Sequence, residues 1–297
     1  MTQTLKAGVV GAGVFGGYHA KKYAELPDVT LAAVFDVDLA RAQALAGPLG
    51  AQAFDDMDAF LAAVDVVTVA TPAVHHAGAA LAALKAGKHV LCEKPVGLAI
   101  EEVEELARVV RKTGKVFQIG HMKRFDPGIE AAKAFIDSDM GARLALKAWY
   151  CDSTHRYTMT DAVQPLPILS KSALKPAGNP KADLKRYYML AHGSHLVDLA
   201  RHLCGDIEWV RARLLERFGA HCWFVETGFA DGTLGHLDLT VAVRMDWHEG
   251  FQLYGENGSV IAKTYNPWYY KSSDVEIFDE RTATYHRPLG ADGHFYR

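Results

Sequence analysis

The chain has 297 residues, 49% of them hydrophobic, which is enough to bury at least one substantial core and fits two domains better than one. Lys and Arg number 32 against 35 Asp and Glu, a formal net charge of -3, so no overall positive field exists to attract nucleic acid or anionic lipid. These numbers argue against a nucleic-acid partner and favour a small-molecule partner.

The cysteines lie far apart and form no CxxC pair, so neither a zinc knuckle nor a disulfide framework is expected. They are Cys92, Cys151, Cys204 and Cys222. A reduced compartment, the cytoplasm, is the predicted location. No segment reaches the ~18 apolar residues that a membrane span needs, so no membrane association is predicted.

Short apolar runs alternate with amphipathic, alanine-rich stretches from residue 5 to about residue 120, which is typical of βαβ units around a parallel sheet. The runs cover residues 7–10, 30–35, 64–70, 89–92 and 116–119. Two stretches between them, 76–86 and 100–112, end close to a glycine that can cap a helix. Residues 1–121 are therefore predicted to form a Rossmann domain, a doubly wound parallel sheet of the α/β class.

The pattern changes after this first domain. A helix is predicted near residues 127–136, and strand-like residues follow at 142–150. Residues 152–185 carry four prolines and little periodicity, which predicts one long loop. Residues 190–203 then predict one strong helix.

Strands dominate the rest of the chain from residue 207 onward. Residues 237–243 alternate apolar with polar or small side chains, which gives a strand one apolar face. Asp231-Gly232 and Asn257-Gly258 are signals for hairpin turns. Residues 122–297 are therefore predicted to form a substrate-binding α+β domain with a large, mostly antiparallel open sheet. The sheet face left over after its helices have packed predicts a homodimer or homotetramer.

The turn after the first apolar run carries a dinucleotide-binding signal, because Gly11, Gly13 and Gly16 have the GxGxxG spacing. Gly11 permits the tight turn, Gly13 lets the backbone approach the pyrophosphate, and Gly16 allows the helix to pack closely on the strand. The helix that begins at Val14 and Phe15 then offers N–H groups and a partial positive charge to the phosphates.

Asp36 decides which cofactor is expected. It ends the second apolar run, twenty residues after Gly16, where a carboxylate accepts hydrogen bonds from the adenine ribose. Its charge would also repel the additional phosphate of NADP, so NAD is the predicted cofactor and NADP the less favoured alternative. A glycine-rich turn without a ligand is the other interpretation, and the acid in register makes it the weaker one.

Two short motifs follow later apolar runs of the first domain. Ala70-Thr71-Pro72 comes at the end of the run 64–70, and Glu93-Lys94-Pro95 follows the run 89–92. Both are therefore expected at the carboxyl edge of the sheet, where the nicotinamide should rest. Together with the Rossmann fingerprint, these residues resemble the Gfo/Idh/MocA family of oxidoreductases, whose members carry an EKP motif with its lysine in the active site.

Two further motifs extend the resemblance over nearly the whole chain. Residues 120–127 (GHMKRFDP) look like the segment that enters the family's second domain, especially in its inositol dehydrogenase branch. Residues 193–198 (GSHLVD) are similar to its active-site helix. The resemblance implies that Lys94 and His195 are the catalytic pair. It also implies cofactor contacts from Thr71, Pro72, His76, Glu93 and Lys94, and substrate contacts from Lys94, Met122, Lys123, His195 and Asp198.

Three features depart from the family pattern. Position 191, four residues before the helix histidine, is Ala where many family dehydrogenases have Asp, and His192 either substitutes for that carboxylate or simply packs. Ala73 stands where an asparagine is common, although His76 matches the histidine that usually follows. The chain stops at Arg297, where relatives continue into another helix, which fits a truncated or partly ordered chain.

The resemblance implies hydride transfer between nicotinamide C4 and a carbinol carbon of a sugar, sugar acid or cyclitol. His195 is the expected acid/base, because the unperturbed pKa of histidine is about 6.5, whereas Lys94 more naturally donates a hydrogen bond to the developing alkoxide. Lys123 leaves room for a substrate with an acidic group. His195, Asp198 and His202 have the helical spacing of a metal site, but hydride chemistry already accounts for the first two, so no metal is predicted.

Two other functions stay open at this point. An NAD-binding enzyme with a closed redox cycle, such as one that cleaves a glycosidic bond, would release no NADH. A non-catalytic NAD-binding sensor would fit Ala191 and Ala73, although the retention of Lys94 and His195 argues against it.

Overall fold

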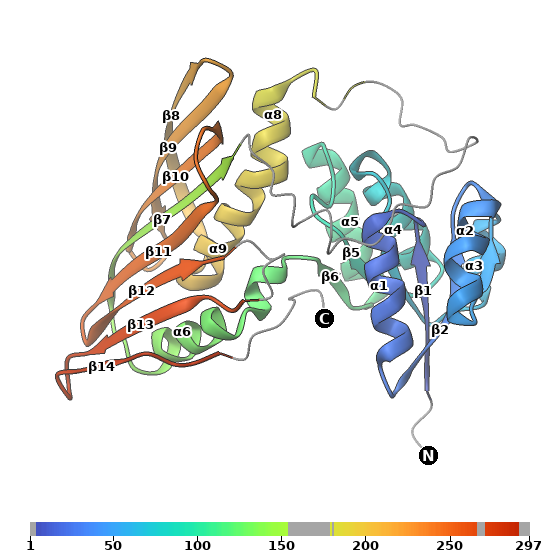
Figure 1. Ribbon diagram of the computed structural model, residues 1–297, viewed down its shortest axis with the longest axis horizontal. Helices are drawn as coiled ribbons and strands as arrows, with labels where there is room; N and C mark the ends of the chain where they lie inside the picture. The colour runs from blue at the N-terminus through green and yellow to red at the C-terminus, as the bar shows by residue number, and fades with distance from the viewer. Residues whose placement is uncertain (1–3, 154–178, 180, 266–270, 291–297) are drawn as a thin grey trace. The chain divides into compact units, whose positions relative to one another are not determined.

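The structure is a computed structural model that describes residues 4–153, 179, 181–265 and 271–290. The chain divides into two compact units, which are described one at a time (Figure 1). Nearly all described residues of the first unit precede His121, and the described part of the second unit covers most of the chain from His121 onward. Within the described ranges, no helix is long and apolar enough to cross a membrane.

The first unit is built on a six-stranded parallel sheet with the order β3-β2-β1-β4-β5-β6. Its strands are β1 (Leu5–Val10), β2 (Val29–Phe35), β3 (Gln52–Phe54), β4 (Val66–Val69), β5 (His89–Cys92) and β6 (Phe117–Ile119). The predicted parallel sheet is confirmed, but β3 was missed because three residues at a sheet edge are too few to show a period. The strand order reverses between β1 and β4, where doubly wound sheets bind their ligands.

Helices cover this sheet and begin or end where local chemistry dictates. They are α1 (Val14–Glu25), α2 (Leu39–Ala46), α3 (Met57–Ala62), α4 (His76–Lys85) and α5 (Ile100–Thr113), with 3-10 turns η1 (Gly47–Leu49) and η2 (Ala73–His75). The Asp38 side chain accepts a hydrogen bond from the N–H of Ala40 and so starts α2. Gly114, with φ of 63°, ends α5 in the left-handed conformation that glycine adopts without strain. The core between sheet and helices is formed mainly by Val, Leu, Ala and Phe side chains.

The second unit contains an eight-stranded sheet with the order β14-β13-β12-β11-β7-β10-β9-β8. Its strands are β7 (Arg143–Ser153), β8 (Ile207–Arg217), β9 (Ala220–Phe229), β10 (Leu234–Val243), β11 (His248–Gly255), β12 (Gly258–Thr264), β13 (Asp274–Asp279) and β14 (Thr284–His286). All neighbours are antiparallel except β7 and β10, which run parallel. The predicted turns at Asp231-Gly232 and Asn257-Gly258 connect β9 to β10 and β11 to β12, so the mostly antiparallel sheet is confirmed.

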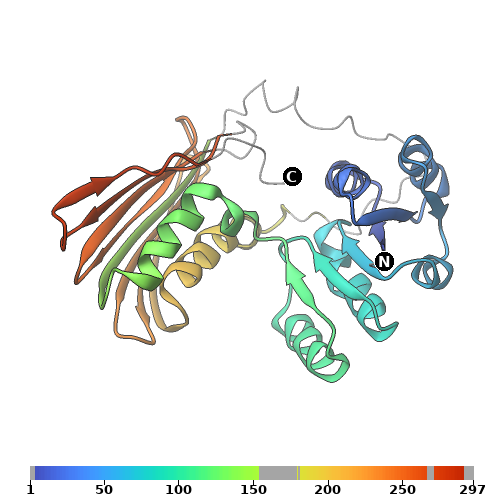
Figure 2. The ribbon, with the colours of Figure 1, turned by 90° about the horizontal axis from the view of Figure 1, so that it is seen from below.

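Helices of the second unit pack on one face of this sheet (Figure 2). They are η3 (Met122–Phe125), α6 (Pro127–Ser138), α8 (Leu184–Tyr188), the π-helical turn η4 (Met189–Gly193) and α9 (Ser194–Cys204). The predicted single helix at 190–203 therefore starts earlier and contains a π turn, which periodicity alone does not reveal. Of the predicted loop at 152–185, Asp152 and Ser153 belong to β7, the last two residues to α8, and residues 154–178 and 180 lie outside the described residues.

The opposite face of the second sheet is its outer face, which carries exposed large apolar side chains. Strand register places on it Trp209, Leu215, Phe224, Leu234 and Ile261. Alternation along β10 puts Leu237 and Leu239 on the helix-covered face instead, where they are buried. The sheet therefore has one packed and one open side, as predicted.

Candidate active site

The glycine-rich turn after β1 is shaped by close backbone contacts. Gly11 has φ of 105°, and a Cβ atom there would lie 2.8 Å from the carbonyl oxygen of Ala70. A Cβ at Gly16 would lie 1.8 Å from the carbonyl oxygen of Gly11, so α1 packs on the turn only if this residue is glycine. Gly13 is the N-cap residue of α1 and has no side chain to accept a hydrogen bond from the helix. The first N–H groups of the helix can therefore bind a ligand.

Asp36 is held in place at the end of β2. Its Oδ2 accepts a hydrogen bond from the N–H of Ala12 at 2.8 Å, and its Oδ1 accepts one from the N–H of Asp38 at 3.0 Å. The guanidinium Nε of Arg41 lies 3.9 Å from Oδ2, and Arg41 Nη2 donates to the carbonyl of Ala12 at 3.2 Å. The carboxylate is thus tied to the glycine-rich turn, where each oxygen keeps a lone pair for a further donor.

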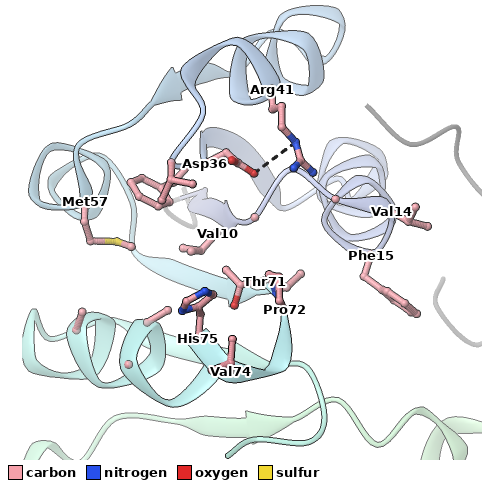
Figure 3. A pocket seen from close by; sticks show the side chains of 18 residues that line it. Val10, Val14, Phe15, Asp36, Arg41, Met57, Thr71, Pro72, Val74 and His75 are labelled. Atoms are coloured by element: carbon pink, nitrogen blue, oxygen red, sulfur yellow. Dashed lines mark ion pairs between the residues drawn. The ribbon is translucent and has the colours of Figure 1, made fainter. Parts of the chain in front are cut away.

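A cavity of about 620 Å³ opens beside this carboxylate, entirely within the first unit (Figure 3). Seven of the predicted cofactor residues line it: Gly11, Gly13, Val14, Phe15, Asp36, Thr71 and Pro72. Asp36 and Arg41 stand on one side of the cavity, and Thr71, Pro72 and His75 stand on the other.

The cavity fits a dinucleotide by its donor set as well as by its size. Within the described part of the chain, Thr71 Oγ1 and Arg41 Nε are buried and have no hydrogen-bond partner. Buried polar atoms ordinarily find a partner, and both belong to residues of the cavity wall. A cofactor with hydroxyl and phosphate oxygens would supply those partners. Sequence reasoning missed Arg41, because a basic residue near a βα turn is too common to indicate a cofactor contact.

His76, Glu93 and Lys94 lie outside the wall of this cavity. The ring nitrogens of His76 lie 2.7 Å from the carbonyl oxygens of Pro95 and Thr71, so this buried imidazole joins the loop after β4 to the loop after β5. Glu93 Oε1 lies 2.9 Å from Nε2 of His19, and Glu93 Oε2 accepts from the N–H of Lys94 at 3.3 Å. The EKP segment is therefore anchored to α1 through His19, a contact that the sequence analysis missed.

Tyr150, at the end of β7, is the centre of a polar and aromatic cluster in the second unit. Its ring is stacked parallel to that of His195, with centroids 6.2 Å apart and an interplanar angle of 4°. Its hydroxyl lies 3.1 Å from Nδ1 of His192, and its ring meets that of Trp247 edge-on at 5.0 Å. The predicted site residue His195 is thus brought together with residues that are far from it in sequence.

Lys123 lies under the same cluster and is almost fully buried. Its ammonium forms an ion pair with the fully buried Glu249 and lies 5.1 Å from the centroid of the Tyr150 ring. Glu249 Oε2 also accepts a hydrogen bond from Trp247 Nε1 at 3.2 Å. The structure therefore gives Lys123 a carboxylate partner within the protein, whereas the sequence analysis expected it to leave room for an acidic substrate.

Asp198 and Met122 are also buried. Asp198 accepts two hydrogen bonds from Arg124, from Nε at 2.9 Å and Nη2 at 2.6 Å, and Nε2 of His121 lies 3.7 Å from it. The hydrogen bonds to Asp198 outweigh the effect of burial and raise the pKa of Arg124. This bidentate pair joins η3 to α9.

His192 lies between two partners from β7. Tyr150 contacts its Nδ1, and Oδ2 of Asp152 lies 3.4 Å from its Nε2. The sequence analysis left the role of His192 open and missed Asp152, which it had placed in a loop. Strand β7 instead continues to Ser153 and presents Asp152 beside the helical segment.

Other chemistries find little support in the described residues. Burial raises the pKa of Cys92 and of Cys204 to about 12 and that of Cys151 to about 11, so these thiols stay protonated near neutral pH. No group of His, Cys, Asp and Glu side chains with the arrangement of a metal site occurs among the residues that the structure describes.

Comparison with known families supplies the deciding observation. A model described as "Oxidoreductase family, NAD-binding Rossmann fold" matches residues 5–121, and a model of the GFO/IDH/MocA C-terminal domain matches residues 175–261. The chain belongs to the Gfo/Idh/MocA family. The predicted family, fold class, NAD cofactor and oxidoreductase activity are confirmed.

Two curated relatives are named as dehydrogenases, and one similar solved structure contains NAD. The UDP-N-acetylglucosamine 3-dehydrogenase of Acidithiobacillus ferrooxidans is 41% identical over 126 residues, which cover 42% of this chain and 40% of that protein. The inositol 2-dehydrogenase of Rubrobacter xylanophilus is 27% identical over 271 residues, or 87% of this chain and 71% of that protein. The solved structure of GenD2 from gentamicin A biosynthesis, in complex with NAD, is 28% identical with a TM-score of 0.68, covering 89% of this chain and 74% of that one.

The match to the first of these relatives spans less than half of either protein, and its length of 126 residues is that of a single domain. Membership in the Gfo/Idh/MocA family establishes an NAD-binding Rossmann protein of an oxidoreductase family.

Proposed function

We propose that this protein is a dehydrogenase that transfers a hydride between NAD and a secondary hydroxyl of a sugar, sugar acid or cyclitol. The observation that carries the proposal is the cluster around Tyr150. It combines aromatic rings, which suit the apolar face of a sugar ring, with imidazole and carboxylate groups, which suit its hydroxyls. The names of the relatives point to the same substrate class.

The proposed roles of the side chains follow the family pattern. When bound, NAD supplies the acceptor for the hydride. Lys94 donates a hydrogen bond that stabilises the developing alkoxide, and an imidazole of the helical segment 189–204, His195 in the family pattern, exchanges the hydroxyl proton. Met122, Lys123 and Asp198 shape the substrate side, Lys123 through its buried ion pair and Asp198 through Arg124.

The proposed cofactor preference is NAD over NADP. Asp36 lines the cavity where the adenine ribose is expected, and Asp38 donates its N–H to Asp36. Among the described residues that line the cavity, Arg41 is the only Lys or Arg. One guanidinium next to two carboxylates leaves a net negative site, which disfavours an additional phosphate.

We also propose that the protein is cytoplasmic and assembles as a homodimer or homotetramer through the outer face of the second sheet. The exposed Trp209, Leu215 and Phe224 on that face would lose contact with water on association. Light scattering across the micromolar range tests the assembly, and a monomeric mass throughout would overturn it.

The test of function is NADH formation from NAD with a panel of inositols, aldoses and sugar acids. Lys94→Ala is expected to lower the turnover about a hundredfold or more, because the alkoxide loses its donor. Lys85→Ala, an exposed lysine on α4, is the matched control and should leave turnover unchanged.

Binding of NAD is followed separately by quenching of protein fluorescence. Binding without NADH formation on any member of the panel would contradict the dehydrogenase and favour a closed redox cycle or a sensor. A sensor in particular should keep NAD binding and show no turnover in either variant.

A further inference from the structure

His76 is the first residue of α4 and joins two loops of the first unit. Its Nδ1 lies 2.7 Å from the carbonyl oxygen of Pro95, and its Nε2 lies 2.7 Å from the carbonyl oxygen of Thr71. Thr71 follows β4 and Pro95 follows β5, and these two strands are neighbours in the sheet. His76 is buried, with 3% of its surface accessible, so water does not compete for either contact.

The two contacts together determine the charge of the His76 ring. A carbonyl oxygen can only accept a hydrogen bond, so each ring nitrogen must carry a proton to bind its partner. A neutral imidazole carries one N–H in either tautomer, whereas the imidazolium carries two. A neutral ring would direct a lone pair at a carbonyl oxygen 2.7 Å away, where the two acceptors repel each other. The arrangement of the two loops therefore requires the imidazolium.

Two effects oppose a positive charge at His76. Burial disfavours the charged form of an imidazole, and the N-terminus of a helix such as α4 repels a cation. Both contacts, however, have the short length that is typical of hydrogen bonds from a charged donor, which are roughly twice as strong as neutral ones. Two carbonyl groups thus take the place of water around the ring and offset the cost of its burial.

The basic groups near this bridge do not stabilise a second positive charge. Lys94 directly precedes Pro95, and the exposed His75 directly precedes His76. Lys85, the other basic residue of α4 besides His76, stands at the opposite end of that helix. The charge of the ring therefore depends on its two carbonyl partners.

The acidic groups near the bridge are engaged elsewhere or exposed. Glu93 Oε1 lies 2.9 Å from Nε2 of His19 on α1. On α5, which packs against α4, Glu101 is exposed and Glu102 Oε2 accepts hydrogen bonds from the N–H groups of residues 98 and 99. The contacts of the His76 ring are thus to backbone carbonyl groups and not to these carboxylates.

The loop that His76 holds through Thr71 forms one wall of the cofactor cavity. Thr71, Pro72 and His75 stand together on that side of the cavity (Figure 3). Among the described residues, Thr71 Oγ1 is one of the buried polar atoms without a hydrogen-bond partner, which makes it available to a cofactor. The other loop carries Lys94 directly before Pro95. A change in either contact of His76 therefore moves the cavity wall relative to the Lys94 loop.

We propose that His76 bridges the loops after β4 and β5 as an imidazolium and that its proton is thermodynamically linked to the binding of NAD. The ring lies outside the cavity wall, so His76 is a positioning residue that acts on the cofactor through Thr71. Loss of the proton removes one of the two hydrogen bonds and releases one loop. The protonated form therefore binds NAD more tightly, and NAD affinity falls as the pH rises. This role needs NAD as the cofactor but does not depend on the proposed hydride transfer.

The first test measures the dissociation constant for NAD by fluorescence titration between about pH 6 and pH 8.5, where Asp36 stays ionised and an ordinary lysine stays charged. The wild type is expected to bind NAD about tenfold more weakly at the upper end, which corresponds to the loss of one hydrogen bond. H76Q carries an amide that does not titrate in this range, so its affinity should be constant and close to that of the wild type at the upper end.

The matched control is H236Q, which removes an exposed histidine of the second unit and should keep the pH dependence of the wild type. Thermal unfolding verifies that both variants are folded. H19Q is measured in parallel, because His19 also contacts the segment that carries Lys94 through Glu93. It should keep the pH dependence as well.

A second measurement needs neither a variant nor the cofactor. The two ring nitrogens of His76 are observed by 15N NMR in the wild type at neutral pH and assigned through their couplings to the backbone. Both are expected at the chemical shift of a protonated nitrogen, because both donate to carbonyl oxygens.

The outcomes separate this role from the proposed function. An unprotonated ring nitrogen at neutral pH would overturn the imidazolium, and equal pH dependence in H76Q and the wild type would overturn its link to NAD. A dependence that H19Q abolishes and H76Q preserves would overturn it too and assign the effect to the contact of His19 with Glu93. If NAD bound with the expected dependence but no NADH formed on any substrate, the dehydrogenase would be contradicted and the role of His76 would stand.

Discussion

The two units differ in how their functional residues are distributed along the chain. In the first unit, Gly11, Gly13 and Gly16 lie within one turn, and Asp36 binds that turn directly through Ala12. In the second unit, the ion pair of Lys123 and Glu249 joins residues 126 positions apart. Tyr150 on β7 contacts His192 and His195 of the helical segment 189–204 and Trp247, which directly precedes β11. A local motif therefore builds the cofactor site, whereas tertiary packing builds the candidate substrate site.

The largest effect is expected from adding a single methyl group to the glycine-rich turn. Gly16→Ala places a Cβ 1.8 Å from the carbonyl oxygen of Gly11, so α1 must move away from the turn and its N–H groups leave the phosphate position. NAD affinity is expected to fall at least about hundredfold, which corresponds to about 2.7 kcal/mol. Fluorescence titration with NAD measures the loss, and thermal unfolding verifies that the variant is folded.

Gly47→Ala is the matched control, because a Cβ at that position meets nothing within 4 Å. It should leave NAD affinity unchanged. If Gly16→Ala bound NAD as tightly as the wild type, the turn would not be as tightly packed as these contacts require.

This contrast explains how much of the cofactor site could be predicted. A turn that needs glycine at fixed spacing, followed by an acid after the next strand, leaves a local trace in the sequence. Arg41 and His75 leave none of comparable strength, because many positions in a βα turn tolerate a basic or polar residue. His76 shows a further limit. Its position matches the family spacing, but the imidazole joins two loops by their carbonyl groups and lies outside the cavity wall.

The candidate substrate site could be predicted only in part, for a physical reason. Short motifs single out His195, Asp198 and Lys123 as candidates, but their partners Tyr150, Arg124 and Glu249 depend on strand register and helix packing. The burial of Lys123 also cannot be predicted from the sequence, because the segment GHMKRFDP has the polar composition of a protein surface. Asp152 was missed because the chain after it has the composition of a loop, although β7 extends through Ser153.

The candidate substrate site is held together by tertiary contacts, so we expect the stability of the protein to depend on its buried ion pair. Glu249→Ala leaves the ammonium of Lys123 buried without its carboxylate, which is expected to lower the free energy of unfolding by about 3–5 kcal/mol. Urea unfolding at neutral pH measures the change.

A double variant, Lys123→Met with Glu249→Leu, should recover much of this loss, since neither charge then remains in the core. Asp137→Asn breaks the exposed pair with Lys133 and should change stability by less than about 0.5 kcal/mol. Equal losses in Glu249→Ala and Asp137→Asn would mean that the buried pair does not hold the cluster together.

The smallest expected effect concerns His202 on α9, beside the helix residues of the candidate site. Burial, and then the positive charges of Arg124 and Lys133, hold the pKa of His202 below its ordinary value. The unfolded chain therefore binds a proton at this residue more readily than the folded chain, so stability falls as the pH drops through the unfolded pKa of about 6.5 towards the folded one. Relative to His202→Gln, the wild type should be more stable at pH 7.5 than at pH 5.5.

Urea unfolding of both proteins at the two pH values measures this difference, which should be well below the effect of Glu249→Ala. His236→Gln, an exposed histidine on β10, is the control and should change stability equally at both pH values. If the wild type instead became more stable relative to His202→Gln on acidification, the pKa of His202 would be raised in the folded chain. Nearby carboxylates such as Asp198 would then outweigh burial and the charges of Arg124 and Lys133. In that case Arg124 would neutralise the charge of Asp198 less completely than their two hydrogen bonds imply.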